Sequence, residues 1–459
     1  MDIQDIFAQT PVLVRVGHVV TPEVVAHDVV AQVVEGRVAG WQPAQEVAPE
    51  QVGAQRPEWA LVAGLVNAHS HAFQRLFRGR TEHLHPDHPD DDFWTWRAHM
   101  YEVANTLDPG AMFAAALDVY GEMAATGITH VGEFHYVHHQ PDGTPYEDPN
   151  IMAHQLIRAA REIGLRITLL RVVYQRGGFG QAAHLHQRRF IDPDLDDALR
   201  AIDALRQAYA ADPCVTIGLA PHSVRAVGQA SMARVAHYAR DHGMPLHVHA
   251  CEQRAEVQQA LEAHGKTPIE LLHDARVLGP RTTLVHATHL SPRDLDLIAT
   301  SGAMVCACPS TERNLGDGFL PALELLRRRV RVCLGSDSHA NIDLWDEMRL
   351  VEYHERLRYE RRNVLAGAYG AWHPKPTQAP QRHDTAALLL PMAQSHGTQS
   401  LSHDPHEPPA ALEDFCVVDT SHWSIRGTHA DSLTSDLAFS LKPAAVRATV
   451  VAGRIVWCA

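Results

Sequence analysis

The sequence predicts an α/β protein in which a (β/α)₈ barrel of the TIM type carries a small β-sandwich domain built from both termini. Between residues 60 and 340, short β-rich runs alternate eight times with longer stretches of helical composition, as is typical of this barrel. Several helical stretches end in a glycine just before the next β-rich run, which is a common helix stop signal. Short valine-rich segments with tight turns lie near both chain ends. An open doubly wound sheet is the alternative to the barrel.

The small domain takes its expected strands from the two ends of the chain. These strands are residues 12–20, 28–40, 414–419 and 447–457, joined in part by turns such as EG and AG. We therefore expect residues 1–58 and 411–459 to form the small β domain, and residues 59–410 to form the barrel.

The barrel strands are expected in eight runs that are rich in β-branched residues and end in polar residues. The runs are 61–71, 129–137, 165–174, 214–223, 245–252, 282–290, 303–311 and 330–339. A segment at 372–410 interrupts the pattern, because it is rich in proline, histidine, glutamine and serine. Its first part predicts a surface loop, whose histidines could equally bind metal adventitiously, and TAALLLPMAQSHG at 385–397 predicts a helix.

Composition narrows the class of protein. A chain of 459 residues exceeds the size of about 250–300 residues at which single cores stop growing, and it has no apolar run of about 18 residues that would predict a membrane span. A net charge of −14 argues against nucleic acid or an anionic membrane as the main partner. The acidic start MDIQDIF is unlike a secretory signal, and seven scattered cysteines without a Cys-x-x-Cys pair predict reduced thiols in a cytoplasmic protein.

Polar residues gather where the expected barrel strands end, which is where such barrels carry their functional groups. The residues are His69, His71, Glu133, His135, His222, His247, His249, Glu252, His286, His289, Asp337 and His339. Any one of them could be an ordinary hydrogen-bonded side chain in a chain with 33 histidines. Their shared placement nevertheless favours a functional site in the barrel mouth.

The spacing of His69 and His71 puts both imidazoles on the same side of a strand, so both can reach one ion. Two histidines alone bind weakly. His249 from the fifth strand and Asp337 from the eighth would complete a set of three nitrogens and one oxygen. Such a set suits Zn²⁺ or Fe²⁺ with one position left for water, and it generates hydroxide near neutral pH.

Two further residues could move protons or stabilise charge. Glu252, three residues past His249, could deliver a proton to a departing nitrogen, although a surface glutamate at a helix start is the plainer interpretation. His286 could polarise the electrophile or stabilise an oxyanion, although it could equally make a hydrogen bond at a strand end.

The order of these motifs resembles the amidohydrolase superfamily, specifically its deaminase branch, over essentially the whole chain. The matching order is His-x-His after strand one, His-x-x-Glu after strand five, His after strand six and Ser-Asp after strand eight. In the dinuclear branch of that superfamily a carboxylated lysine on strand four bridges two metals. This chain has only Lys266, Lys375 and Lys442, none of them on the expected fourth strand, so one metal ion is expected.

Several longer stretches resemble the formimidoylglutamate deiminase family, which acts in histidine breakdown. They are HSHAFQRLFRG (69–79), DDFWTWRAHMY (91–101), EFHYVHH (133–139), GLAPHSVRAV (218–227), LVHATHL (284–290), STERNLGDG (310–318) and GSDSH (335–339). The resemblance implies hydrolysis of N-formimidoyl-L-glutamate to N-formyl-L-glutamate and ammonia. A superfamily deaminase of a purine or pyrimidine-type base is the alternative.

The same resemblance implies roles for individual residues. His69, His71, His249 and Asp337 would bind one divalent ion, Zn²⁺ first and Fe²⁺ second, with Glu252, His286 and Asp337 as catalytic groups. Gln74, Tyr136, His222 and Arg225 would contact the substrate. A small dicarboxylate needs fixed cations, which Arg225 and, as a weaker candidate, Arg97 could supply; otherwise both arginines are solvated or salt-bridged surface groups. A homodimer is the expected assembly.

Two stretches depart from the family pattern. PPAALEDFCVVD (408–419) stands where many relatives carry a Gly-Arg-x-Ala-Asp turn, which puts the edge of the small domain in doubt. Residues 366–384 match no part of the family and suggest a local insertion.

Overall fold

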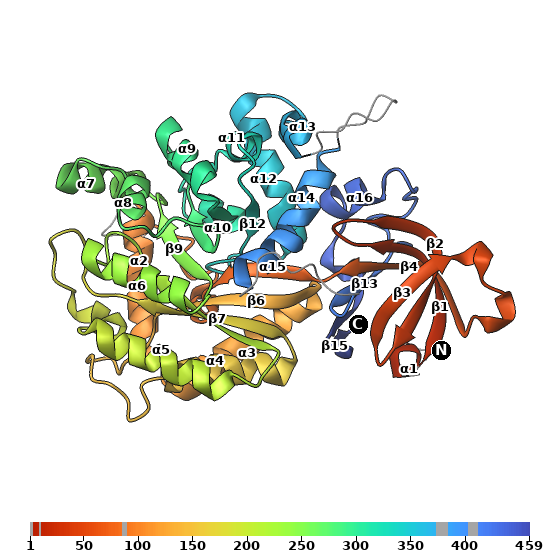
Figure 1. The fold of residues 1–459 in the computed structure, drawn as a ribbon, viewed down its shortest axis with the longest axis horizontal. Coiled ribbons are helices and arrows are strands. Elements are labelled where there is room, and N and C mark those ends of the chain that lie inside the picture. Colours follow the sequence, from red (N-terminus) through yellow and green to blue (C-terminus); the bar gives the residue numbers. More distant parts are fainter. Residues whose placement is uncertain (1–2, 9–10, 85–89, 373–383, 403–411) are drawn as a thin grey trace.

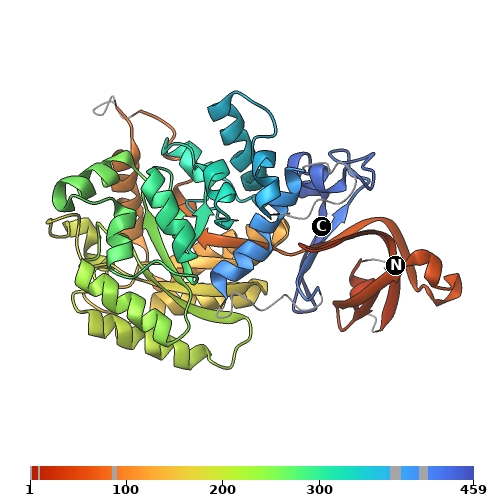
Figure 2. The ribbon, with the colours of Figure 1, turned by 45° about the horizontal axis from the view of Figure 1, so that its top comes forward.

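The computed structural model describes residues 3–8, 11–84, 90–372, 384–402 and 412–459. Eight parallel strands form a barrel that helices surround, and a small β domain lies to one side of it (Figures 1 and 2). None of the helices in these ranges is both long and apolar enough to cross a membrane.

The barrel strands pair in chain order, each one parallel to the next. They are β5 (Leu65–Ser70), β6 (Ile128–His135), β7 (Arg166–Val173), β8 (Val215–Pro221), β9 (Leu246–Ala250), β10 (Thr282–His286), β11 (Met304–Ala307) and β12 (Val332–Leu334). Each of the eight predicted runs contains one of these strands.

The first and last strands meet at their carboxyl ends. Asp337 N donates to His69 O over 3.0 Å and His71 N donates to Asp337 O over 3.1 Å. Below them, Asn67 Nδ2 donates to Ser336 Oγ over 2.7 Å, and Ser336 N donates to Asn67 Oδ1 over 3.0 Å. These bonds join β5 to the residues after β12, so the predicted barrel is confirmed and the open doubly wound sheet is wrong.

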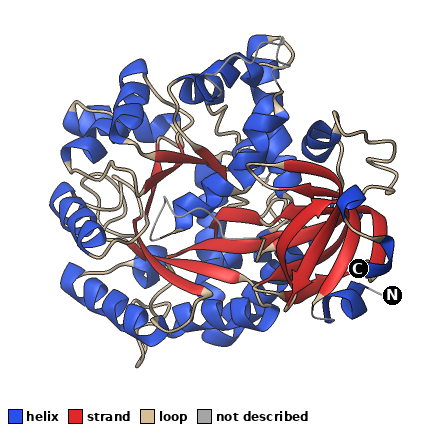
Figure 3. Ribbon diagram, turned by 45° about the vertical axis from the view of Figure 1, so that its right-hand side comes forward, coloured by secondary structure: helices blue, strands red, loops and turns tan. Residues whose placement is uncertain are grey.

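Helices cover the outside of the barrel (Figure 3). They are α2 (Phe93–Thr106), α3 (Pro109–Ala125), α4 (Ile151–Ile163), α5 (Leu195–Tyr209), α6 (Gln229–Asp241), α7 (Arg254–His264), α8 (Pro268–Asp274), α9 (Pro292–Ser301), α10 (Pro309–Asn314), α11 (Ala322–Arg327), α12 (Leu344–Tyr359) and α13 (Tyr369–Trp372). The glycine stop signals work as predicted: Gly164 ends α4 with φ 99°, and Gly302 ends α9 with φ 77°, a region that favours glycine.

The small domain is one seven-stranded sheet with strands from both termini, as predicted (Figure 1). Its strands are β1 (Val12–Val20), β2 (Val25–Val34), β3 (Arg37–Pro43), β4 (Ala54–Ala63), β13 (Phe415–Asp419), β14 (Val446–Val451) and β15 (Arg454–Cys458). The antiparallel pair β4–β13 joins the N-terminal and C-terminal strands. Val38 of β3 and Val450 of β14 belong to one hydrophobic core, which α1 (Ile3–Ala8) also enters, so the sheet curls around a single core.

The run predicted at 61–71 covers the end of β4 and all of β5, which Gly64 separates. A Cβ atom at Gly64 would lie 2.3 Å from Thr129 Oγ1, so no larger residue fits where the chain passes from one sheet to the other. The expected domain boundary between residues 58 and 59 falls inside β4. The boundary between 410 and 411 lies outside the described residues.

The amino end of the barrel is plugged by a segment from late in the chain. The single helix predicted at 385–397 is instead two helices, α14 (Ala386–Ala393) and α15 (Ser395–Leu401), because the backbone breaks at Gln394 with φ −125° and ψ −101°. Ser400 O accepts a hydrogen bond from His247 of β9, and Leu401 O accepts one from Thr168 of β7. Most of the loop predicted before these helices, residues 373–383, lies outside the described residues, and so does Lys375. A last helix, α16 (Leu433–Phe439), packs on α12 and α14.

Candidate metal centre and substrate pocket

Four predicted ligands converge at the carboxyl end of the barrel. His69 Nε2 lies 3.2 Å from His71 Nε2 and 3.1 Å from His249 Nε2. Asp337 Oδ1 lies 3.4 Å from His69 Nε2 and 3.3 Å from His71 Nε2. Ligand atoms about 2.0–2.1 Å from a tetrahedral ion lie about 3.3–3.4 Å from one another, so these separations fit one Zn²⁺-sized ion.

The outer atoms of the histidines also suit metal binding. His71 Nδ1 donates to Phe134 O over 2.9 Å, and His249 Nδ1 donates to His222 O over 3.2 Å. A backbone carbonyl that accepts from one ring nitrogen leaves the other nitrogen free for a metal and fixes the orientation of the ring. In the part of the chain that the structure describes, His69 Nδ1 is buried without such a partner.

Burial of the histidines and the contacts of Asp337 put the four side chains in the charge state that a metal needs. It lowers the pKa of His69 to about 3, although Asp337 opposes the shift, and it lowers the pKa of His71 and His249 as well. For Asp337, burial would raise the pKa, but contacts with His69, His286 and His71 lower it below its usual value. Three neutral imidazoles and one carboxylate are therefore ready to bind a divalent cation.

His286 lies beside this cluster with carboxylates on both sides. Its Nε2 is 3.6 Å from Glu252 Oε1 and 3.8 Å from Asp337 Oδ2, while its Nδ1 is 3.5 Å from Glu312 Oε1. Burial alone would lower the pKa of His286, but Glu252, Glu312 and Asp337 together raise it to about 10. The three carboxylates therefore favour the imidazolium form of His286, which can donate a hydrogen bond to a developing negative charge.

Glu252 is a buried carboxyl group beside the His286 ring. Burial raises the pKa of this carboxyl group, while His286 opposes the shift. A surface glutamate at a helix start, the plainer interpretation, is therefore wrong. The backbone near the cluster is also unusual: His286 has φ 71° and Asp337 has φ 48°, conformations that concentrate at functional sites.

The four predicted ligands His69, His71, His249 and Asp337 form the metal cluster, and an inner cavity joins this cluster to the predicted substrate contacts. Its walls include His71, Gln74, Arg97, Tyr136, His222, Arg225, His249, Glu252, His286 and Asp337. Gln74 Nε2 donates to Tyr136 Oη over 2.9 Å, which leaves the buried Gln74 Oε1 without a partner among the described residues. Burial lowers the pKa of His222 well below its usual value, so this ring is neutral.

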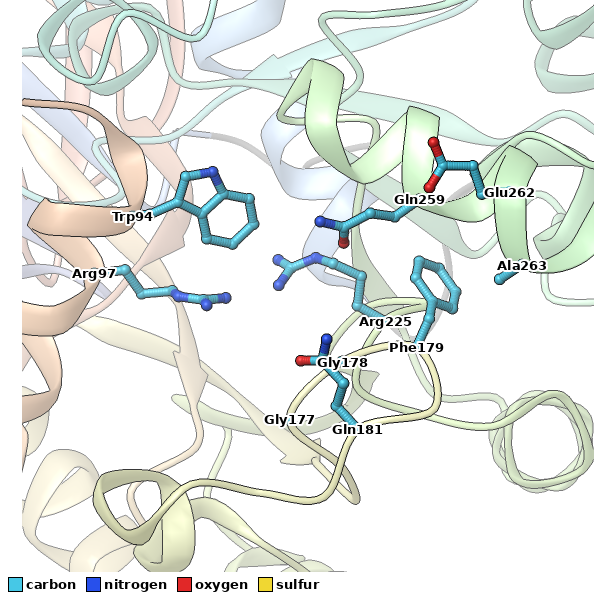
Figure 4. A pocket seen from close by; sticks show the side chains of 10 residues that line it. All are labelled: Trp94, Arg97, Gly177, Gly178, Phe179, Gln181, Arg225, Gln259, Glu262 and Ala263. Carbon is cyan, nitrogen blue, oxygen red and sulfur yellow. The ribbon is translucent and has the colours of Figure 1, made fainter. Parts of the chain in front are cut away.

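Arg97 and Arg225 also face an outer pocket of about 490 Å³. Figure 4 shows the two guanidinium groups pointing toward each other across this pocket, with Trp94 beside them. Their Cζ atoms lie 4.4 Å and 5.8 Å from the centroid of the Trp94 ring. Within the described ranges neither guanidinium pairs with a carboxylate. Two buried or half-buried cations that share a cavity form an anion site.

The other polar residues at strand ends do not join this cluster. Residues alternate between the two faces of a strand, and Phe134 of β6 faces the mouth, with its ring 4.3 Å from that of His249. Glu133 therefore points outward, where it accepts hydrogen bonds from Ser70 Oγ and Ala72 N. His135 also points outward.

Three more strand-end histidines have partners elsewhere. His247 bonds to Ser400 in the plug, and His289 Nε2 donates to Asp317 O over 2.7 Å. His339 Nε2 lies 3.1 Å from Ser70 Oγ, on the outer side of β5. These residues lie at strand ends, as predicted, but they are not part of the cluster in the barrel mouth.

Sequence reasoning missed three buried carboxyl groups around Glu252 and His286. Glu256 Oε2 accepts from Glu252 N over 3.1 Å, and burial raises the pKa of Glu256 to about 7 against the effect of Arg225. Burial, and then the charge of Glu252, raise the pKa of Asp317 to about 9. Glu256 lies four residues after Glu252, in the first turn of α7, which is a usable signal. Glu312 and Asp317 lie in STERNLGDG, where nothing in their spacing marks a role.

Comparison with known proteins agrees with this geometry. The family model described as "Amidohydrolase family" matches residues 60–368, more than half of the chain. A formimidoylglutamate deiminase from Pseudomonas aeruginosa is 36% identical over 413 residues, which cover 88% of this chain and 86% of that protein. A 5-methylthioadenosine/S-adenosylhomocysteine deaminase from Syntrophobacter fumaroxidans is 26% identical over 92% of this chain and 87% of its own.

Solved structures show the same fold. An amidohydrolase from Brucella melitensis superposes with a TM-score of 0.82 at 32% identity, covering 97% of this chain and 96% of that one. An adenosine deaminase from Xanthomonas campestris, solved with bound zinc, superposes with a TM-score of 0.78 at 23% identity, covering 97% and 92% of the two chains. The second likeness concerns the fold alone.

Proposed function

Since the chain belongs to the amidohydrolase family, whose members use a divalent metal, we propose that it hydrolyses N-formimidoyl-L-glutamate to N-formyl-L-glutamate and ammonia. One observation carries the choice of substrate: Arg97 and Arg225 line the same inner cavity as Glu252, His286 and the metal cluster. A dicarboxylate that carries an amidine fits a cavity with cations on one side and proton-transfer groups on the other. The similarity to the Pseudomonas aeruginosa deiminase supports the same choice.

The substrate would lie with its carboxylates toward the arginines. Arg225 is buried and can offer its guanidinium as a two-pronged donor, while Arg97 can take the second carboxylate from the opposite wall. Gln74, Tyr136 and His222 line the path between the arginines and the metal cluster. In this orientation the formimino carbon lies close to Glu252 and His286.

The proposed reaction forms a C–O bond from water, breaks the C–N bond to the terminal nitrogen and releases that nitrogen as ammonia. His69, His71, His249 and Asp337 would hold a divalent ion, which would lower the pKa of a bound water so that hydroxide is available near neutral pH. Glu252 holds the proton that comes from the water and passes it to the departing nitrogen. The His286 imidazolium donates a hydrogen bond that stabilises charge on the attacked group.

We propose zinc as the resident ion, with iron(II) as the alternative, because three imidazoles and one carboxylate accept both. A single ion is proposed because β8, the fourth barrel strand, contains no lysine that could bridge two ions. Metal analysis of protein purified without added metal, followed by reconstitution with each ion, would identify the one that restores activity.

The test of the substrate is ammonia release from N-formimidoyl-L-glutamate by protein loaded with metal. Turnover with a clear preference for this substrate over its aspartate analogue would support the proposal. Absence of turnover with a full complement of metal would overturn it.

A deaminase of a purine or pyrimidine-type base is the second candidate, favoured by the nucleoside deaminases among the relatives. It would use the same metal ligands. Arg225→Ala separates the two: a charge-assisted hydrogen bond contributes about 1.5–3 kcal/mol, so KM for a dicarboxylate should rise about tenfold or more. A neutral base should be affected far less. Glu252→Gln should lower kcat by about 10²–10⁴-fold for either activity and serves as the common control.

A further inference from the structure

The backbone of Arg225 is fastened more firmly than its side chain, which forms no salt bridge within the described residues. It projects from the turn Ser223–Val227, which follows β8, and it is 5% exposed. Its buried Nε has no hydrogen-bond partner among the described residues, and its guanidinium contacts the face of Trp94 at 5.8 Å. The direction of this cation therefore depends on the conformation of the turn.

Arg176, from the loop after β7, fastens that turn. Its Nε donates to Arg225 O over 2.8 Å, and its Nη2 donates to Val224 O over 2.8 Å and to Val227 O over 3.4 Å. The backbone adds two more bonds, since Gln175 N and Arg176 N both donate to Ala226 O, over 2.9 and 3.0 Å. Four consecutive carbonyls of the turn, at residues 224–227, thus accept hydrogen bonds from residues 175 and 176.

The other end of the turn is attached to the metal cluster. His249 N donates to His222 O over 3.1 Å, and His249 Nδ1 donates to the same oxygen over 3.2 Å. Ser223 and His249 also form a parallel bridge between the turn and β9. The turn therefore spans the distance from a candidate metal ligand to the arginine that faces the substrate carboxylate, with Arg176 fixing its far end.

We propose that Arg176 is a positioning residue that sets the place of Arg225 relative to the metal cluster and so determines selectivity for a carboxylate-bearing substrate. The inference rests on the proposed function, because it assigns Arg225 to a substrate carboxylate. Arg176 itself lies behind the pocket wall: the pocket is lined by its neighbours Gly177, Gly178 and Phe179 (Figure 4), but Arg176 does not line it.

Only an arginine suits this position. A guanidinium presents several donors in one plane, so a single side chain can reach carbonyls of three different residues, whereas an ammonium is a point charge on a flexible stem. The Arg176 guanidinium also lies 5.7 Å from the centroid of the Phe179 ring. It thereby connects the Phe179 side of the outer pocket to the turn that carries Arg225.

The test uses full-length protein loaded with metal and compares Arg176→Ala, Arg176→Lys, Arg225→Ala and the double variant Arg176→Ala/Arg225→Ala. Misplacement of a binding group by about 1 Å can cost about 100-fold, so we expect Arg176→Ala to raise KM for N-formimidoyl-L-glutamate about tenfold, with a much smaller change in kcat. Arg176→Lys should resemble the alanine variant, and it guards against loss of folding by retaining charge and bulk. Arg240→Ala is the matched control, because Arg240 also donates to a backbone carbonyl, that of Arg276, but lies on α6 outside the pockets.

The double variant separates positioning from a general structural role. If Arg176 acts through Arg225, adding Arg176→Ala to Arg225→Ala should change KM less than about twofold. An equal effect of Arg176→Ala in both backgrounds, or no effect on KM at all, would overturn the proposal.

Binding of glutarate, a five-carbon dicarboxylate, measured by calorimetry gives a readout that does not depend on turnover. If the wild-type protein binds glutarate but does not hydrolyse N-formimidoyl-L-glutamate, the proposed function fails, and about tenfold weaker binding by Arg176→Ala would still support the role of Arg176. If the wild-type protein neither binds glutarate nor turns over the substrate, both proposals fail.

Discussion

The two ends of the barrel use the same residue type on the same strand for different purposes. His247 and His249 lie two residues apart on β9, so both side chains point to the same face, about 7 Å apart along the strand. His249 Nε2 lies 3.1 Å from His69 Nε2 in the metal cluster. His247 Nε2 donates to Ser400 O over 3.0 Å in the plug.

The difference lies in what each end leaves unsatisfied. At the amino end, neutral hydrogen bonds link α15 to the strands: Ser400 Oγ lies 2.9 Å from Thr283 Oγ1, and Thr168 Oγ1 donates to Leu401 O. At the mouth, buried oxygens of Glu312 and Asp317 have no hydrogen-bond partner within the described residues. Among the described residues, the amino end also leaves two buried atoms without a partner, His247 Nδ1 and Gln394 Oε1, but both are neutral, whereas the unpaired atoms at the mouth are carboxyl oxygens. In barrels of this class the first arrangement supports stability and the second supports catalysis.

The largest expected effect comes from replacing His249, which is the one of these two histidines that lies among the candidate metal ligands. His249→Ala removes one of four ligand atoms, so bound metal should be lost and kcat/KM should fall by more than about 100-fold, the upper range for loss of an outer partner alone. Metal content and ammonia release measure both effects. His247→Ala is the control and should keep its metal. If both variants lost metal equally, the contrast between the two ends would be wrong.

Glu252→Gln should lower kcat by about 10²–10⁴-fold, because an amide has nearly the same shape but cannot carry the proton to the departing nitrogen. Metal content should stay unchanged, since Glu252 is not among the four clustered ligands. Single-turnover kinetics with metal-loaded protein would measure the chemical step. A variant with near wild-type kcat would remove Glu252 from the mechanism.

Glu312→Leu tests whether a buried carboxylate at the mouth orients His286. Glu312 Oε1 lies 3.5 Å from His286 Nδ1, the ring nitrogen that faces away from the metal cluster. Loss of a residue that orients an active group typically costs about 10–100-fold, and we expect kcat to fall within that range. Glu312→Gln keeps an oxygen for His286 Nδ1 and should lose less. Equal losses in the two variants would show that the negative charge, and not the orientation, matters.

The contrast between the two ends also shows which parts of the fold and of the site can be predicted from the sequence. The eight β-rich runs and their helical spacers were enough to predict the barrel, and the His-x-His spacing was enough to place His69 and His71 together. The sequence does not mark which face of a strand a residue occupies when its boundaries are uncertain by a residue or two. Glu133 and His135 were therefore grouped with the mouth, although Phe134 and not its neighbours faces it.

Other features depend on segments that are far apart in the chain. The plug at α15 meets β9 and β10 more than one hundred residues after those strands, and no local pattern predicts such a pairing. The hydrogen bonds from Arg176 to the turn that carries Arg225 cannot be predicted from the sequence either, because their acceptors are backbone carbonyls, which every residue has. Motifs identify side chains that do chemistry, but not the contacts with distant backbone atoms that position them.

A smaller effect is expected at the amino end. Ser400→Ala removes a hydroxyl that lies 2.9 Å from Thr283 Oγ1 and 3.1 Å from His247 Nε2, while the Ser400 backbone carbonyl remains as an acceptor. A hydrogen bond of this kind contributes about 1 kcal/mol to the free energy of unfolding. Denaturant unfolding should show a loss of about that size, with unchanged metal content and kcat. A fall in kcat at full metal occupancy would mean that the plug is coupled to the mouth.

A further expected effect is a change in the pH dependence of stability at the plug. His396 of α15 donates from Nδ1 to Val332 O over 2.9 Å, and burial lowers its pKa to about 4. The unfolded chain binds a proton at His396 near pH 6.5 but the folded chain does not, so stability falls as pH drops from about 6.5 to about 4, by at most about 1.4 kcal/mol per pH unit from this residue. His396→Asn places an amide donor near the position of Nδ1 and removes the titration. Unfolding free energies of metal-stripped protein across this range should therefore fall less steeply in His396→Asn than in the wild type, and parallel curves would mean that the folded chain protonates His396 as readily as the unfolded chain does.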